Sequence, residues 1–428
     1  MSKKILSNQT PKGTSDWLPD DFLIRKYIFD KWRKVCLRYG FLEYLTPLVE
    51  HSEIYKAKSG EDIGGNELIT FSDLGGRELS IRPEMTPSVT RMVSKIYASS
   101  SKPLKLFSIA NFMRNEKPQR GRNREFWQLN CDIFGSASIA ADLEILQLSL
   151  DIMREFGAPK DSFVLRLNSR RLLEELLFVF GLKDNKSKDF FRILDKYKKL
   201  SFKEFEARLL YIGLKKEKIR NIDNYMSGKD TKWLNDIIFE NDNLKSAKSE
   251  IDFVIKSLNK LGYDKEVVFD PSLIRGFDYY DGLVFEIFDN HPDNLRALFG
   301  GGRYNGLAEI FGSDRFPAVG FAPGDETMKL FLESWKLINS DIISKASIIY
   351  FPLLSADLLA DSQKLVTKIR RSNEKVFFAF EPQRLSKALE YANKNSYSKV
   401  LIFGHEEKNN NIYKIKDMES GQEEIFNL

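Results

Sequence analysis

The stretch RNEKPQRGRNREFWQ, residues 114–128, carries four arginines and one lysine within its first eleven positions. It connects two strand-like runs, 105–111 and 126–134, and the pattern therefore predicts a β-hairpin whose loop bears the charges. Each guanidinium group offers planar, two-pronged hydrogen bonding that suits a phosphate or a carboxylate. The segment is thus either an anion-binding loop or a solvated basic loop, and taken alone it favours neither interpretation.

The length and charge of the chain set only broad limits. At 428 residues it is too long for one ordinary hydrophobic core, so two or three domains are expected. Its 66 basic and 61 acidic residues give a net charge of +5, which permits a polyanionic partner without requiring one. No apolar stretch reaches membrane-spanning length, and the start, Met-Ser-Lys-Lys, lacks an apolar signal core. We therefore expect a cytoplasmic protein without a membrane partner.

Several kinds of site are disfavoured by the residues present. Cys36 and Cys131 form no CxxC pair, so neither a disulfide framework nor a zinc site is indicated. The three histidines, His51, His291 and His405, have no serine, cysteine or acid at a motif spacing, which argues against histidine-based catalysis. The chain also has no Walker A sequence and no GxGxxG motif, so any bound ATP must be held by other groups.

Hydrophobic periodicity predicts a mixed α+β protein. Besides the hairpin, the elements expected up to about residue 322 are helices over 24–39, from about 88, over 143–153 and over 246–261, and strands over 41–45, 78–81, 163–167, 266–269, 282–288 and 318–322. Lysine-rich helical segments interrupt this order between residues 183 and 243. Because the strands outnumber the helices and join through hairpins, the sheet is predicted to be mostly antiparallel, with helices packed on it.

The chain beyond residue 342 follows a different pattern. The elements expected there are strands over 347–351, 375–380 and 399–404, helices over 357–371 and 384–392, and a closing hairpin of strands 412–417 and 423–426. Alternation of strand and helix predicts a parallel sheet with crossover helices. We therefore divide the chain into residues 1–182 and 244–335 as two parts of one domain, 183–243 as a helical insertion, and 342–428 as a C-terminal α/β domain.

Two further blocks give the arginine loop a context: LIRGFDYY at 273–280 and FGGGRYNG at 299–306. Together the three blocks resemble the motif 2 loop and the two histidine-specific motifs of bacterial-type histidyl-tRNA synthetases, a family of class II aminoacyl-tRNA synthetases. The resemblance implies a mostly antiparallel class II catalytic sheet, a helical insertion domain and a C-terminal domain like the class IIa anticodon-binding domain. It also implies a cytoplasmic homodimer that uses L-histidine, ATP, Mg²⁺ and tRNA(His).

The same resemblance assigns roles to individual residues. It makes Arg114 and Arg275 the catalytic arginines that flank the α-phosphate of ATP. The implied ATP-binding residues are Arg114, Glu116, Arg122 and Arg275. The implied histidine-binding residues are Glu84, Thr86, Gln128, Asp132, Tyr279, Tyr280, Gly301 and Tyr304. The implied contacts to the tRNA acceptor end are Gln119 and Arg124, and no metal ligand is implied. The helix over 24–39 with the strand after it becomes motif 1 of the dimer interface, although an ordinary core helix and strand fit the pattern equally well.

Elementary chemistry is compatible with these roles. Amino-acid activation brings a carboxylate to the α-phosphate of ATP, so two anions must meet, and arginines serve that task better than proton-transfer groups. Gln128 and Asp132 are four positions apart on a predicted strand and so face the same side. Glu84 would accept from the α-amino group, and Asp132 and Tyr280 would each bond one imidazole nitrogen. The glycines at 300–302 leave the backbone bare for a flat ring, or form an ordinary glycine-rich turn.

Two positions depart from the family pattern. Class II enzymes place an arginine in motif 3 where this chain has Thr327, and Lys329 lies roughly 200° away around the helix. The family often has glutamate at the position of Asp132. The main alternative is the histidine-binding regulatory paralogue of ATP phosphoribosyltransferase, which does not activate histidine. That paralogue generally lacks the insertion and the C-terminal domain and does not need the loop over 118–124. This chain has all three, which favours the synthetase over the paralogue, and the motif blocks disfavour a synthetase for another amino acid.

Overall fold

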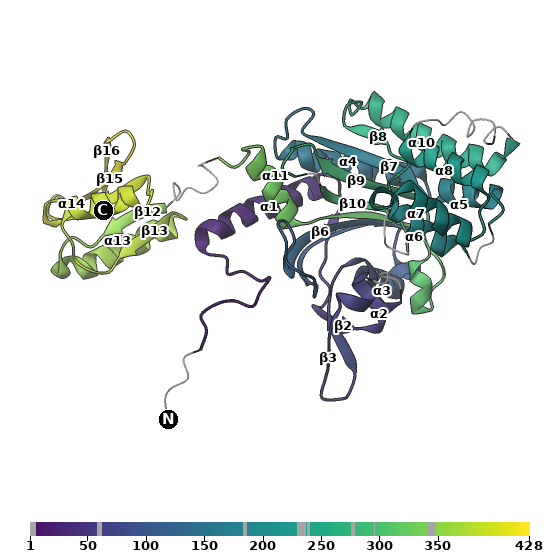
Figure 1. Ribbon diagram of the computed structural model, residues 1–428. Helices are drawn as coiled ribbons and strands as arrows, with labels where there is room; N and C mark the ends of the chain where they lie inside the picture. The colour runs from purple at the N-terminus through teal and green to yellow at the C-terminus, as the bar shows by residue number, and fades with distance from the viewer. Residues whose placement is uncertain are drawn as a thin grey trace. The chain divides into compact units, whose positions relative to one another are not determined.

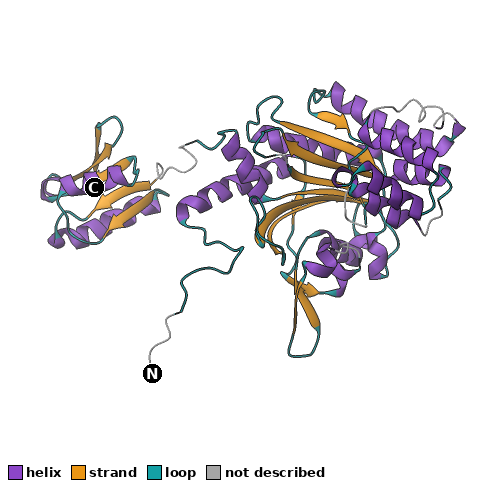
Figure 2. Cartoon of the chain, viewed as in Figure 1, coloured by secondary structure: helices purple, strands orange, loops and turns teal. Residues whose placement is uncertain are grey.

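The computed structural model describes residues 6–57, 62–182, 186–228, 237, 240–274, 279–294, 296–339 and 348–428. The chain divides into two compact units, Met1–Leu337 and Ile338–Leu428. Figure 1 traces the elements along the chain, and Figure 2 separates its helices from its strands. No helix among these residues is long and apolar enough to cross a membrane.

The first unit is built on an eight-stranded sheet. In spatial order its strands are β1 (Leu42–Glu43), β5 (Leu104–Met113), β6 (Glu125–Phe134), β11 (Ala318–Pro323), β10 (Ala297–Arg303), β9 (Leu283–Asp289), β7 (Phe163–Ser169) and β8 (Val267–Phe269). All neighbours from β5 to β7 are antiparallel, and only the outer pairs β1–β5 and β7–β8 run parallel. The prediction of a mostly antiparallel sheet in an α+β fold is confirmed.

Three helices pack on β6 and on one another: α1 (Pro19–Arg38), α4 (Ile139–Glu155) and α11 (Asp325–Ser334). Helix α1 begins with a proline in its first turn, where the missing N–H costs nothing, and Asp20 and Asp21 complement the positive end of its dipole. Its buried side chains include Ile28, Trp32 and Val35, spaced as one apolar face requires. The polypeptide leaves the helix at Gly40, whose φ of +76° suits a glycine after a helix end.

The glycines at 300–302 lie in a central strand, β10, and not in a turn. Glycine is required here by close approach of the backbones. A Cβ on Gly301 would lie 2.1 Å from the carbonyl oxygen of Gly320 on β11, and one on Gly302 would lie 2.6 Å from that of Leu283 on β9. Sequence patterns missed this strand because glycine-rich segments have low intrinsic strand propensity.

The remaining elements of the first unit lie around this sheet. The helices are α2 (Glu53–Lys56), α3 (Thr86–Ile96), α5 (Arg170–Val179), α6 (Ser187–Asp195), α7 (Phe202–Tyr211), α8 (Lys216–Ser227) and α10 (Asp242–Lys260). A small antiparallel sheet has the order β2 (Val49–His51), β4 (Glu78–Ile81), β3 (Ile69–Ser72). Short 3-10 or π turns are η1 (Asp62–Asn66), η2 (Tyr97–Ser99), η4 (Tyr197–Lys199) and η5 (Leu307–Phe311). Ser201 and Glu204 form a reciprocal cap at the start of α7, which fixes where that helix begins.

The second unit contains a five-stranded mixed sheet. Its spatial order is β13 (Lys375–Ala379), β12 (Ile348–Pro352), β14 (Lys399–Ile402), β15 (Ile412–Asp417) and β16 (Glu423–Asn427). The first three strands are parallel and the last two form an antiparallel hairpin, as the alternation of elements predicts. The helices are α13 (Leu359–Arg371), preceded by the turn η6 (Ala356–Leu358), α14 (Leu385–Lys394) and a short α15 (His405–Asn409) that the sequence pattern missed.

Candidate active site

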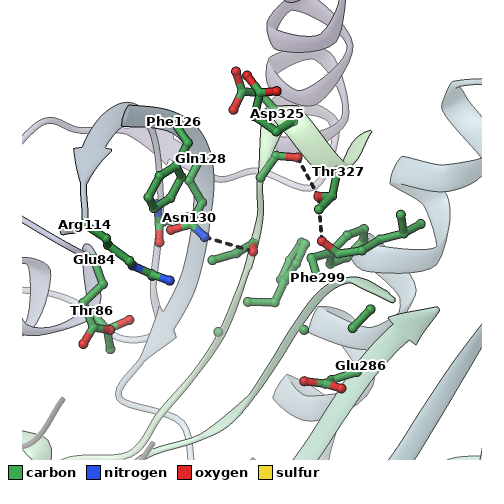
Figure 3. A pocket seen from close by; sticks show the side chains of 18 of the residues that line it. Glu84, Thr86, Arg114, Phe126, Gln128, Asn130, Glu286, Phe299, Asp325 and Thr327 are labelled. Atoms are coloured by element: carbon green, nitrogen blue, oxygen red, sulfur yellow. Dashed lines mark hydrogen bonds between the residues drawn. The ribbon is translucent and has the colours of Figure 1, made fainter. Parts of the chain in front are cut away.

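A cavity of about 320 Å³ opens on the sheet of the first unit, between β6, β10, β11 and the arginine loop. Figure 3 shows Glu84, Thr86 and Arg114 on one side of it and Phe299, Thr327 and Glu286 on the other. The lining residues that the sequence predicts for the site are Glu84, Thr86, Arg114, Glu116, Arg122, Gln128, Asp132, Tyr279, Tyr280 and Tyr304. Thus the fold brings together groups from distant parts of the sequence in one cavity.

Three of the predicted site residues that the structure describes do not line this cavity. Gly301 lies within β10, beside the lining residue Gly300. Gln119 and Arg124 belong to the arginine loop but do not line the cavity: Gln119 faces Arg296, and Arg124 donates from Nε to the carbonyl oxygen of Glu116 at 3.1 Å. Arg275, the second predicted catalytic arginine, lies outside the described residues.

Asp132 and Tyr304 form a buried polar pair at the cavity wall. The Tyr304 hydroxyl donates to Oδ1 of Asp132 at 2.5 Å, and both side chains are almost inaccessible to solvent. Burial raises the pKa of the Asp132 carboxyl to about 7, against the hydrogen bond from Tyr304, which lowers it. Gly320 makes room for this carboxylate, because a Cβ there would lie 2.0 Å from Oδ1 of Asp132.

Glu84 faces the cavity from the segment that precedes α3. It is buried, and Oε2 accepts a hydrogen bond from the Tyr279 hydroxyl at 3.0 Å. The segment is anchored through buried Arg82, whose guanidinium donates to the carbonyl oxygens of Thr46 at 2.8 Å and Asn111 at 2.9 Å. A carboxylate is thereby held in a fixed position, ready to accept from a cationic ligand group.

Arg114 continues from β5 into the arginine loop. Its Nε donates to the carbonyl oxygen of Pro83 at 3.0 Å, and its guanidinium lies 5.0 Å from the centre of the Phe126 ring. No hydrogen bond joins either Nη group to another described residue. Burial lowers the pKa of this guanidinium, whereas the nearby charge of Glu84 raises it. One side of the guanidinium is thus fixed to the protein while its two-pronged end remains available to an anion.

The arginine loop folds back as a tight turn. Gln119 and Arg122 exchange two backbone hydrogen bonds of 2.9 Å around Gly121, whose φ is +74°. Arg122 lies in the cavity and pairs with Glu116 at 3.1 Å. Gln119 instead faces Arg296, which donates to its Oε1 at 2.8 Å. The turn therefore separates the loop into a cavity side and an outer side.

The comparisons with known proteins agree with this arrangement. A family model described as "Histidyl-tRNA synthetase" matches residues 13–326. The chain is 38% identical to a histidine–tRNA ligase of Leptospira biflexa over 434 residues, covering 100% of this chain and 97% of the relative. The chain belongs to the histidyl-tRNA synthetase family.

An archaeal relative and two solved structures also resemble this chain. A histidine–tRNA ligase of Pyrococcus abyssi is 34% identical over 96% of this chain and 95% of its own length, so the comparisons establish the family and not the bacterial type in particular. A crystal structure of histidyl-tRNA synthetase from Nostoc shares the fold with a TM-score of 0.80 and 22% identity, covering 99% of this chain and 97% of that one. A Bacillus halodurans structure titled as an ATP phosphoribosyltransferase regulatory subunit/histidyl-tRNA synthetase has a TM-score of 0.72, 23% identity and coverage of 94% and 99%.

The predicted motif 3 region of this family member lies at the cavity wall and at the start of α11. Thr327 lines the cavity and donates to the carbonyl oxygen of Leu298 at 2.8 Å. Asp325, at the start of α11, accepts from the backbone N–H of Trp127 at 2.9 Å and forms a buried ion pair with Arg25 of α1. Burial raises the pKa of Asp325 to about 6, although the charge of Arg25 opposes this shift. A single carboxylate therefore joins β6, α11 and α1.

Some synthetase site residues escaped the sequence reasoning. The structure adds to the cavity wall Phe126, Asn130, Glu286, Phe299 and Asp325. The period-two alternation that places Gln128 and Asp132 on one face also predicts Phe126 and Asn130 there, so those two had a usable signal. No sequence signal connected Arg25 with Asp325, because they lie at opposite ends of the first unit's sequence.

Proposed function

We propose that the chain is a histidine–tRNA ligase. It activates L-histidine with ATP to histidyl-adenylate and transfers histidine to the 3′ end of tRNA(His). The observation that carries this proposal is one cavity with Arg114 at one place and the buried Asp132–Tyr304 pair at another. An arginine fixed through Nε suits two anions that must meet, and a buried acceptor suits a polar ring.

The chemistry assigned to the site is positioning and charge neutralisation. Arg114 and Arg275 would flank the α-phosphate, and Arg122 with Glu116 would bind the rest of ATP. The described residues hold no group of three or more histidine, cysteine or acidic side chains suited to a metal ion. Mg²⁺ would bind together with ATP, because it is usually held by substrate phosphates with one or two carboxylates.

Histidine is assigned to the other side of the cavity. Asp132 and Tyr280 would each bond one imidazole nitrogen, with Tyr304 holding Asp132 in place. Glu84 would accept from the α-amino group, with Tyr279 holding its carboxylate. The other proposed contacts to histidine are Thr86, Gln128 and Gly301.

The proposal is tested by histidine-dependent ATP–pyrophosphate exchange with purified protein and each amino acid in turn. We expect exchange with histidine alone. In Arg275→Ala we expect exchange to be lost with little change in histidine affinity, because this arginine would act on the transition state and not on the ground state. Arg275→Lys should also be poor, since a point charge cannot replace a planar fork. Exchange at the wild-type rate in Arg275→Ala would remove this residue from the mechanism.

The regulatory paralogue shares the fold, but relatives that match this chain along nearly its whole length, such as the Leptospira biflexa protein, are histidine–tRNA ligases. The paralogue binds histidine without activating it, so it needs no charged group over ATP. Here Arg122 and Glu116 form an ion pair inside the cavity, which favours a nucleotide-handling site. Histidine binding without any exchange would support the paralogue instead.

The outer side of the arginine loop is assigned to the tRNA acceptor end. Gln119 uses its Oε1 to accept from Arg296, and we propose that its amide Nε2 reads a base edge of the extra 5′ guanosine of histidine tRNA. Gln119→Ala should slow aminoacylation and narrow the advantage of tRNA that has this guanosine, while exchange is unaffected. Arg124→Ala should weaken both tRNAs alike and reduce the salt dependence. Single-turnover transfer from histidyl-adenylate to the two tRNAs measures this, and an unchanged preference in Gln119→Ala would refute the assignment.

We further propose a cytoplasmic homodimer in which motif 1 lies at the interface. Leu37, Leu42 and Leu45 are exposed by 54%, 68% and 69%, an apolar surface near the edge strand β1 that a second copy would cover. Residues 183–243 are proposed as the family's helical insertion and 342–428 as its anticodon-binding domain.

A further inference from the structure

Asn130 is a buried amide at the cavity wall. It lies on β6 between Gln128 and Asp132, and since side chains alternate along a strand, all three face the cavity (Figure 3 labels Gln128 and Asn130). Only 3% of Asn130 is exposed, and its Nδ2 makes no hydrogen bond to any described residue. A buried donor without an acceptor destabilises the folded protein, so this position calls for a ligand group.

The neighbours of Asn130 do not supply that acceptor. Gln128 uses its amide to donate to the carbonyl oxygen of Ala322 at 3.3 Å, and Asp132 accepts from Tyr304. Directly across the β5–β6 ladder lies Ser108, which is fully buried and whose Oγ also has no hydrogen-bond partner in the described part of the chain. Since Nδ2 bonds none of these groups and Asn130 lies at the cavity wall, a group bound in the cavity can supply the missing acceptor.

We propose that Asn130 donates a hydrogen bond from Nδ2 to the α-carboxylate of bound histidine. This rests on the proposed function, in which Asp132 bonds the ring. Two residues along a strand span about 6.6 Å, which is comparable to the separation of ring and carboxylate in one histidine molecule. Asn130 is neutral, so it orients the carboxylate without adding a second cation beside Arg114. The carboxylate then keeps the negative charge with which it attacks the α-phosphate.

The test compares two ligands and two matched variants. Histidine and histidinol, in which an alcohol replaces the carboxylate, are titrated calorimetrically without ATP into wild type, Asn130→Ala and Ser108→Ala. Asn130→Ala should weaken histidine roughly ten- to a hundredfold, the range for a hydrogen bond to a charged group, and histidinol by less than about threefold. Ser108→Ala, equally buried on the adjacent strand but not at the cavity wall, should change neither. Asn130→Asp should weaken histidine further through like-charge repulsion.

Equal losses for both ligands in Asn130→Ala would show that Asn130 only shapes the pocket, and no loss would show that it makes no contact; either result overturns the proposal. Asn130→Leu is the control for folding. Because it removes an unpaired buried donor, the melting temperature of its ligand-free form should equal or exceed that of the wild type. A wild-type protein that binds no histidine would refute the proposed function itself. A wild type that binds histidine, with an Asn130→Ala variant that binds it equally well, refutes only this inference.

Discussion

Arg114→Ala is expected to lower the rate of histidine-dependent ATP–pyrophosphate exchange by about 10²–10³-fold, the range for removing one donor to a developing charge. The reason lies in how the side chain is held. Its Nε donates to Pro83, the ring of Phe126 lies beside it, and its Nη groups remain for the two reacting anions. Arg114→Lys should do little better, because an ammonium group cannot donate to Pro83 and at the same time present a fork.

The control for Arg114 is Arg154→Ala. Arg154 also lies over an aromatic ring, 3.9 Å from the centre of Tyr263, but it lines no part of the cavity. Exchange should stay near the wild-type rate in this variant. An Arg114→Ala protein that exchanges within about tenfold of wild type would contradict the role given to Arg114.

Asp132→Asn is expected to lose histidine binding and gain stability at the same time. Burial raises the pKa of this carboxyl from 3.8 to about 7. Between these two values the folded protein keeps a proton that the unfolded chain has lost, so stability falls as pH rises through that window. Above pH 7 the full cost applies, at most about 4 kcal/mol, because each pH unit between the two pKa values contributes about 1.4 kcal/mol. Asparagine carries no charge and avoids this cost, but its neutral amide oxygen is a weaker acceptor for an imidazole N–H than a carboxylate.

The measurement is urea unfolding of wild type and Asp132→Asn at pH 8 and at pH 4.5. All five tryptophans lie in the first unit, so tryptophan fluorescence reports on that unit alone. The variant should be more stable by most of this cost at pH 8 and by only about 1 kcal/mol at pH 4.5. Calorimetry at pH 8 should show histidine affinity reduced by at least about a hundredfold. A gain of the same size at both pH values would mean that packing, and not the charge of Asp132, is responsible.

The sequence predicts much of this fold because its strong signals are local. The two hairpin strands around the arginine loop were placed to within two residues, since alternating apolar residues on both sides of a charged loop leave little choice. The same period of two placed Gln128 and Asp132 on the cavity face. The family resemblance then grouped Glu84, Tyr280 and Tyr304, which no periodicity connects.

The strand and the contacts that the sequence did not predict share a physical cause: they depend on tertiary contacts between segments that are distant in the sequence. Strand β10 depends on glycines that let three backbones approach, and no local propensity reports that. The Arg25–Asp325 pair and the approach of Cys36 to Cys131, whose sulfur atoms are 3.3 Å apart, exist only because α1 packs on β6. The two cysteines are 95 positions apart in the sequence, and the fold brings their side chains together.

The position of β6 between β5 and β11 has a consequence for the chain as it is being synthesised. β5 and β6 emerge from the ribosome together, but Ala322, which accepts from Gln128 across the β6–β11 boundary, follows 194 positions later. Such distant pairings form slowly, because the intervening chain must first close a long loop. Before β11 pairs with it, the edge of β6 that β11 will cover is exposed to water. Translation order thus leaves one wall of the cavity unbuilt until β11 has been made, and a nascent chain that stops before β11 lacks the strand that would complete the proposed histidine site.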